Sequence, residues 1–90
     1  MVESLLKITG RVQGVFFRQS TQEKAYAFGV VGWVQNCSDG SVEALFQGDK
    51  QAVDELVRWC QKGPDHAHVE KVSVLYSKAC TDACDRFTIR

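Results

Sequence analysis

The sequence predicts an α+β fold in which two helices pack on one face of a mainly antiparallel sheet. Three observations support this fold class. Short segments alternate apolar and polar residues, as strands do, and Val42, Ala44 and Phe46 are an example. The segment after Asp49 instead repeats apolar residues at the 3-and-4 spacing of a helix. Turn-forming residues separate the segments at short intervals, and 90 residues suit a single two-layer domain, which we expect to span residues 1–90.

The first third of the chain predicts a strand, a loop and a helix in that order. We expect the strand over residues 4–12, the loop over residues 13–17 and a helix that ends near Phe28, where Gly29 can stop it. The inward face of this helix should carry Thr21, Ala25 and Phe28.

The start of this helix has two candidate positions. Ser20-Thr21-Gln22-Glu23 has the pattern of a capping box and predicts a later start. A start near Phe17 or Arg18 is favoured if the preceding loop binds an anion, because the free N–H groups of a helix N-terminus then face that loop. The sequence leaves both positions open.

The rest of the chain contributes three strands, a second helix and a short terminal strand. The expected elements are strands at 30–37 and 41–47, a helix capped by Asp49 and running to about Gln61, and strands at 68–76 and 86–89. The buried stripe of this helix should be Val53, Leu56, Val57 and Cys60, and Gly63-Pro64 should end it. The resulting order, β-α-β-β-α-β plus a short terminal strand, is the ferredoxin-like arrangement.

Charge and composition exclude several classes of partner. Eleven basic and eleven acidic residues cancel, so no global field favours nucleic acid or an anionic membrane. No apolar stretch approaches the length of a transmembrane helix, and no secretory signal is visible. We therefore expect a cytoplasmic protein without nucleic-acid or membrane partners.

The cysteines and histidines do not predict a metal site. Cys37, Cys60, Cys80 and Cys84 lack the close Cys-x-x-Cys pairing of zinc sites, and the two histidines lack a third ligand at a suitable spacing. In a strand, Cys80 and Cys84 would lie about 13 Å apart and could not be bridged, whereas a loop would permit a small disulfide ring. Reduced thiols are expected in a cytosolic setting.

Residues 10–18 form the most informative segment, which reads Gly-Arg-Val-Gln-Gly-Val-Phe-Phe-Arg. An apolar strand enters a glycine-containing turn that ends in Arg18, and helix-compatible sequence follows. Gly14 can adopt the positive φ that lets successive backbone N–H groups converge on an anion, and Arg18 adds a planar cation suited to phosphate oxygens. The spacing matches neither a Walker A loop nor a dinucleotide fingerprint. On local physics alone, an anion site and an ordinary turn remain alternatives.

A second segment, residues 32–48, distinguishes between these alternatives. Asn36 ends one strand, and Ser38-Asp39-Gly40 supplies the turn before the next. The two segments together resemble the acylphosphatase family. Its first motif, Gly-x-Val-Gln-Gly-Val-x-Phe/Met-Arg, matches residues 10–18. Its second, Gly-aromatic-small-x-Asn, three residues, Gly-x-Val, five residues and Gly, matches residues 32–48. The resemblance extends over essentially the whole chain except for residues 77–85.

The resemblance implies the same fold and the hydrolysis of the carboxyl–phosphate bond of acyl phosphates. It makes Arg18 the phosphate-binding arginine and Asn36 the residue that positions the attacking water. It also implies a phosphate-binding loop made by the backbone of Gln13, Gly14, Val15, Phe16, Phe17 and Arg18. A monomer that acts on a small-molecule acyl phosphate is the family expectation. We expect no metal or cofactor, because no residue cluster resembles a magnesium or zinc site, and we expect inorganic phosphate or sulfate to compete for the same loop.

Other classes of ferredoxin-like domain fit less well. RNA-binding modules display an aromatic strand that is absent here, and copper chaperones need a Cys-x-x-Cys in the first loop, which contains no cysteine. A non-catalytic module that binds an acyl or carbamoyl phosphate remains as the alternative function. Without the family match, Arg18 could simply pair with an acidic side chain and Asn36 could be an ordinary turn residue. The sequence does not distinguish acetyl phosphate, carbamoyl phosphate and 1,3-bisphosphoglycerate as substrates.

Overall fold

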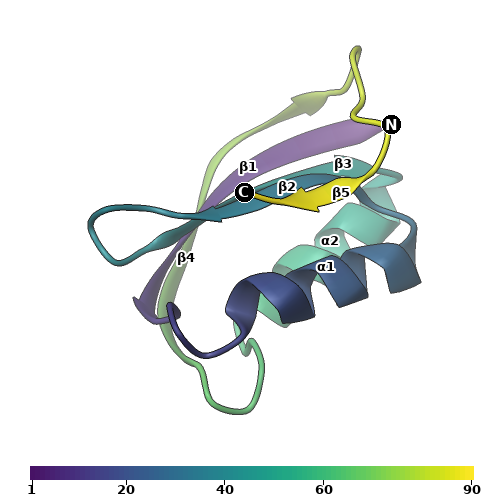
Figure 1. Cartoon of the computed structure of the whole chain (residues 1–90). Coiled ribbons are helices and arrows are strands. Elements are labelled where there is room, and N and C mark those ends of the chain that lie inside the picture. Colours follow the sequence, from purple (N-terminus) through teal and green to yellow (C-terminus); the bar gives the residue numbers. More distant parts are fainter.

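The computed structural model describes all of residues 1–90 and contains five strands and two helices (Figure 1). In chain order they are β1 (Val2–Arg11), α1 (Phe17–Phe28), β2 (Val31–Asn36), β3 (Val42–Gly48), α2 (Lys50–Cys60), β4 (His68–Ala79) and β5 (Phe87–Ile89). Neither helix has the length and apolar character needed to cross a membrane.

The five strands form one sheet in the order β4-β1-β3-β2-β5, and both helices lie on the same face of it (Figure 1). All neighbouring strands are antiparallel except β2 and β5, which run parallel. Fifteen buried apolar side chains from the sheet and the helices form one core cluster, in which Leu6 and Val34 both flank Ala44 across the strands. The predicted ferredoxin-like α+β fold is confirmed.

Helix α1 begins earlier than the capping-box pattern predicted. Phe16 occupies the N-cap position with no side-chain cap, and Ser20 lies inside the helix, where its N–H donates to the carbonyl of Phe16 at 3.0 Å. The capping-box prediction was therefore wrong, because the loop that enters the helix, rather than a local cap, determines its start. At the other end, Gly29 stops the helix in the left-handed conformation, as expected.

The buried faces of the two helices agree with the sequence pattern at all but one position. Thr21 and Ala25 of α1 are buried, but Phe28 is 38% exposed because it lies in the last turn, where the chain leaves the helix. In α2 the buried residues are Val53, Leu56 and Cys60, with Val57 half-buried. Asp49 occupies the N-cap position of α2, but its side chain makes no capping hydrogen bond.

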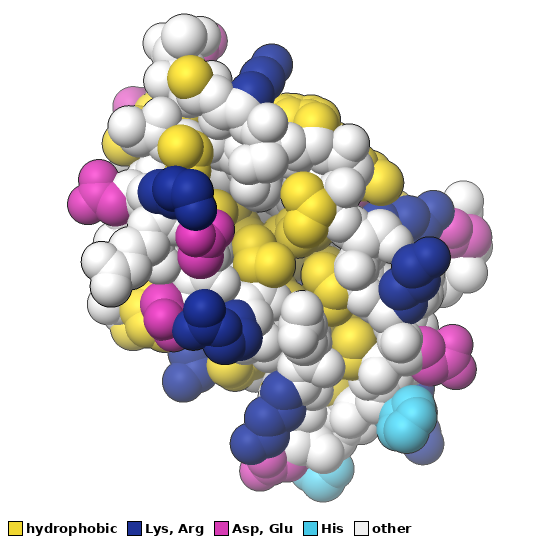
Figure 2. All heavy atoms as spheres, turned by 180° about the vertical axis from the view of Figure 1, so that it is seen from behind, with side chains coloured by type: hydrophobic (Ala, Val, Ile, Leu, Met, Phe, Trp, Pro, Cys, Tyr) yellow, Lys and Arg dark blue, Asp and Glu magenta, His cyan; other side chains and the backbone are white.

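Strand β4 is longer than predicted and forms one edge of the sheet. It pairs with β1 as far as Val2 opposite Ala79, with two irregularities in register that bulge the edge. On the side opposite to Figure 1, hydrophobic side chains gather near the middle of the surface among charged ones (Figure 2). The exposed large apolar residues of β4 are Val74, Leu75 and Tyr76. Cys80 follows this strand, and all four cysteines are free.

Candidate active site

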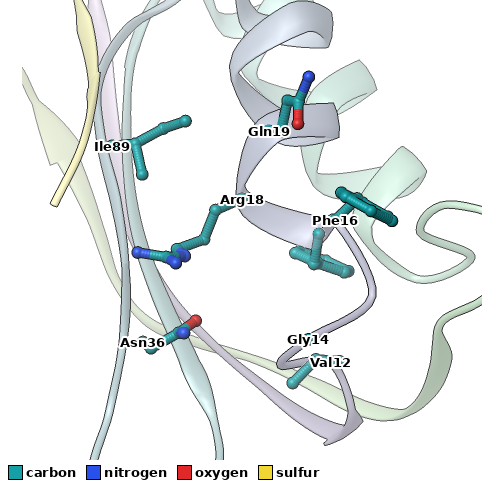
Figure 3. A pocket seen from close by; sticks show the side chains of 8 residues that line it. Val12, Gly14, Phe16, Arg18, Gln19, Asn36 and Ile89 are labelled. Carbon is teal, nitrogen blue, oxygen red and sulfur yellow. The ribbon is translucent and has the colours of Figure 1, made fainter.

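The loop between β1 and α1 and the end of β2 enclose a cavity of about 330 Å³ (Figure 3). Arg18 lies in the first turn of α1, directly after this loop, and Asn36 ends β2; their side chains point toward one another in this cavity (Figure 3). Arg18 is the only cation in its wall, and no carboxylate lines it. The complete lining is Val12, Gly14, Phe16, Phe17, Arg18, Gln19, Asn36 and Ile89.

Two left-handed residues turn the chain from β1 into α1. Gly14 has a φ of 75°, which the sequence predicted. Phe16 has a φ of 62° and is the only non-glycine residue of the chain with a positive φ. Its neighbours explain this: Val15 and Phe17 are both buried, and the backbone reverses at Phe16 to bury both. Nothing in the residue types predicts this conformation at Phe16, because a bulky aromatic residue is disfavoured in it.

The entry into α1 leaves an electropositive helix end at the cavity. The first N–H groups of a helix have no intrahelical partner, and the macrodipole adds positive potential there. No side chain caps this N-terminus, and its first turn contains no acidic residue. Phe17, Arg18 and Gln19, the first three residues of the helix, all line the cavity. This arrangement favours an anion at that end.

The guanidinium of Arg18 is held by a main-chain oxygen and not by an acidic side chain. Its Nη1 donates to the backbone oxygen of Arg90 at 2.8 Å, and Arg18 takes part in none of the ion pairs of the protein. Arg90 is itself fixed, because its N–H donates to the carbonyl of Val34 at 2.8 Å and its guanidinium lies 4.4 Å from the centre of the Trp33 ring. The alternative that Arg18 pairs with an acidic side chain is thus not what the structure contains. Sequence reasoning missed Arg90, which the parallel pairing of β5 with β2 brings to this point.

The side chain of Asn36 is unengaged within the protein. Asn36 is the last residue of β2, is exposed, and makes no side-chain hydrogen bond to another residue. The turn after it is closed by other groups: Asp39 accepts hydrogen bonds from the N–H and hydroxyl of Ser41, and the N–H of Cys37 donates to the carbonyl of Ser41. Asn36 is not needed to brace the turn, so its amide is free to bind a small molecule in the cavity.

Gln13 joins the two segments that build the cavity. Its Nε2 donates to the carbonyls of Cys37 at 2.7 Å and Ser41 at 2.8 Å, so one amide connects the loop to the hairpin that carries Asn36. Of the loop residues predicted to form the phosphate site, Gly14, Phe16, Phe17 and Arg18 line the cavity, whereas Gln13 and Val15 do not. The side chain of Gln13 therefore has a bracing role that the sequence did not indicate.

Buried contacts support the loop from behind. The ring of Phe17 packs against Trp59 of α2 with 5.7 Å between centroids. Gly63, with a φ of 70°, lies so close to Phe17 that an added Cβ would be 2.8 Å from its ring. The loop is thereby held between the two helices and the turn after α2.

An ion pair next to the hairpin turn has a clear electrostatic signature. Nζ of Lys7 lies 2.8 Å from a carboxylate oxygen of Asp39. The hydrogen bond with Lys7 and those from Ser41 lower the pKa of Asp39 well below its usual range, and the pKa of Lys7 is raised by the same partnership. The turn beside Asn36 is therefore stabilised by the ionised form of Asp39.

Comparison with known proteins identifies the family. The family model for acylphosphatase matches residues 5–89. The chain belongs to the acylphosphatase family. An acylphosphatase of Rubrobacter xylanophilus is 64% identical over 67 residues, which cover 74% of this chain and 61% of that relative, somewhat less than two thirds of its length. An acylphosphatase of Roseiflexus sp. is 50% identical over 78 residues, which cover 87% of this chain and 84% of that relative.

A solved structure of the same family agrees with the fold. The crystal structure of acylphosphatase from Bacillus subtilis superposes with a TM-score of 0.95 at 33% identity, covering 100% of this chain and 99% of that one. Acylphosphatases are hydrolases of acyl phosphates, and the chain is classed with these enzymes by family, by sequence similarity and by fold.

Proposed function

We propose that this chain hydrolyses acyl phosphates to a carboxylate and inorganic phosphate, with Arg18 and Asn36 as its catalytic residues. The observation that carries this proposal is the meeting of two groups in one cavity, beside an uncapped helix N-terminus. One is the guanidinium of Arg18, which pairs with no acidic side chain and is held by the main-chain oxygen of Arg90, and the other is the amide of Asn36, whose side chain makes no hydrogen bond within the protein. Membership of the acylphosphatase family supports the same reaction.

The phosphoryl group binds to Arg18 and to the backbone N–H groups of residues 13–18. A guanidinium offers two parallel donors to phosphate oxygens, and the helix N-terminus adds further donors and positive potential. Phosphoryl transfer passes through a loose transition state whose charge lies on the equatorial oxygens, so donors that grip those oxygens stabilise it.

Water attacks phosphorus directly, oriented by Asn36. An amide both accepts and donates hydrogen bonds, so it can hold a water without repelling the phosphate as a carboxylate would. The P–O bond to the acyl group breaks as the water oxygen bonds to phosphorus. The departing carboxylate, whose conjugate acid has a pKa of about 4, needs no protein acid. The water's proton passes to a phosphoryl oxygen, since no carboxylate or histidine lines the cavity.

The remaining parts of the proposal concern partners and conditions. The reaction needs no metal or cofactor, because Arg18 and the helix N-terminus supply the positive potential that a metal ion would otherwise provide. Inorganic phosphate and sulfate compete for the same cradle. The chain acts as a single domain and a monomer on a small-molecule acyl phosphate in the cytoplasm.

Turnover by the purified chain in ¹⁸O-labelled water tests the reaction and the point of attack together. We expect benzoyl phosphate to be consumed in the presence of excess chelator, with ¹⁸O appearing in the inorganic phosphate and not in the benzoate. Label in the benzoate would show attack at the acyl carbon instead. Binding without turnover would favour the alternative, a non-catalytic module for acyl or carbamoyl phosphates.

A further inference from the structure

The phosphate end of the cavity accounts for Arg18 and Asn36 but not for its apolar rim. Phe16 and Ile89 line the same cavity from the loop and from β5, and they lie on opposite sides of Arg18 (Figure 3). Phe16 is 71% exposed, the highest value among the large hydrophobic residues of the chain, and Ile89 is 40% exposed. Two apolar side chains thus stand in solvent next to an anion site.

The backbone at Phe16 does not explain why its side chain is aromatic. A left-handed residue is most easily glycine, and a bulky side chain at a φ of 62° is sterically unfavourable. Glycine at this position would form the same turn and expose no apolar surface. Strained positions of this kind cluster at functional sites, where the surrounding structure maintains them. The side chain of Phe16 therefore has a role of its own at the rim.

The charges of the cavity indicate what that role is. Arg18 is its only cation, and the phosphoryl group occupies it. No second cation lines the cavity to receive a negative group on the acyl side, and no carboxylate lines it to receive a positive one. Apart from the uncharged Gln19, what remains for the acyl group is the apolar rim.

We propose that Phe16 and Ile89 form an acyl-group subsite and that the substrate is an acyl phosphate with an uncharged, apolar acyl group. This proposal rests on the proposed hydrolysis of acyl phosphates at Arg18 and Asn36. An apolar acyl group packs against the two side chains, and burial of its surface favours binding. An acyl group with its own negative charge loses hydration against the same rim without gaining a partner.

A pair of substrates that differ in charge at one position tests the subsite. In 4-methylbenzoyl phosphate and 4-carboxybenzoyl phosphate the ring and the reacting bond are the same, and only the distal group changes. We expect kcat/KM to favour the methyl compound by about tenfold, the lower end of the discrimination that hydrophobic pockets achieve. Equal values for the two compounds in the unmodified protein would overturn the proposal.

Variants at the rim assign the preference to its residues. Phe16→Gly removes the ring and suits the left-handed backbone, so the fold is retained. We expect it to reduce the preference for the methyl compound by at least about threefold, and Ile89→Ala to reduce it in the same direction. Phe28→Ala, which removes a partly exposed ring at the far end of the same helix, should leave the preference unchanged.

Inhibition by inorganic phosphate separates the subsite from the loop that carries it. Phosphate has no acyl group, so its inhibition constant should stay within about twofold in Phe16→Gly. The proposal would be overturned if Phe16→Gly kept the full preference for the methyl compound. It would also be overturned if this variant lost as much affinity for phosphate as it lost kcat/KM for the methyl compound, since Phe16 would then act only through the loop. Absence of turnover of both compounds by the unmodified protein would instead reject the proposed function, and the subsite with it.

Discussion

Replacement of Asn36 by alanine separates binding from chemistry, because the two roles fall on different side chains. Arg18 and the helix N-terminus hold the phosphoryl group, whereas the amide of Asn36 makes no bond within the protein and faces the cavity. Removing it should leave phosphate affinity within a few-fold of the unmodified protein. The rate constant at saturation should fall about a hundredfold, which corresponds to ~2.7 kcal/mol of lost transition-state stabilisation.

The stability of this variant should hardly change. Asn36 is exposed, and the following turn is closed by Asp39, Ser41 and the backbone of Cys37. We expect the free energy of unfolding to change by less than about 0.5 kcal/mol. Ser38→Ala is the matched control, because Ser38 is an exposed polar residue of the same turn that does not line the cavity. Its kinetics should equal those of the unmodified protein.

Two steady-state measurements decide the outcome. The rate constant at saturating benzoyl phosphate reports the chemistry, and the inhibition constant of inorganic phosphate reports the cradle. Asn36→Asp extends the test, because a carboxylate of the same shape would repel the phosphoryl oxygens and weaken phosphate binding as well. A folded Asn36→Ala protein with near-normal turnover would show that another group holds the water.

Substitutions at four further positions test the remaining parts of the site and its supports. Arg18→Ala should lower kcat/KM by at least about a hundredfold and weaken the binding of phosphate. Arg18→Lys should restore only part of the lost kcat/KM, since an ammonium group cannot reproduce the two parallel donors of a guanidinium. Unchanged phosphate affinity in Arg18→Ala would contradict the role of Arg18. Gln13→Ala removes two hydrogen bonds and should cost about 1–2 kcal/mol in urea unfolding, with a fall in kcat because loop and hairpin are no longer joined; full activity would show that the brace is dispensable. Gly63→Ala should destabilise the protein by about 1–3 kcal/mol, seen as a lower Tm, because its new Cβ would press on the ring of Phe17 at a position with positive φ. The lowered pKa of Asp39 implies a contribution to stability that is present above about pH 4 and is lost as the pH falls toward the pKa of the folded state. The difference in unfolding free energy between the unmodified protein and Asp39→Asn should therefore be larger at pH 7 than at pH 3. A difference that does not change with pH would contradict the ion pair with Lys7.

The sequence was sufficient to predict the parts of the site that rest on local chemistry. The glycine-containing turn, its positive φ at Gly14 and the strand that ends at Asn36 all follow from residue types and spacing. The sequence left the start of α1 open, because a capping-box pattern competed with a start near Phe17 or Arg18, and the structure has the earlier start. Tertiary packing determines the start of the helix, because the burial of Val15 and Phe17 fixes the backbone ahead of Ser20.

The supporting contacts could not be predicted, since they join segments far apart in the chain. The hydrogen bond from Arg18 to Arg90 depends on β5, a strand of three residues whose parallel pairing with β2 no periodicity reveals. The bonds of Gln13 depend likewise on the hairpin being in register with the loop. The residue types do not predict these supporting contacts, because glutamine and arginine side chains are most often exposed to solvent on the surface.

Binding and support thus fall on different residues of one short loop. Arg18 and Phe16 face the cavity and are exposed enough to meet a substrate, whereas Val15 and Phe17 are buried and Gln13 is engaged through its Nε2. The buried pair compensates the unfavourable backbone at the residue between them, because relaxing that residue would expose one of the two side chains to water. The loop is consequently preorganised before any phosphate arrives, and little conformational entropy is lost on binding. A site with only one cation and one amide depends on this preorganisation. Groups that had to become ordered during the reaction would stabilise the transition state less.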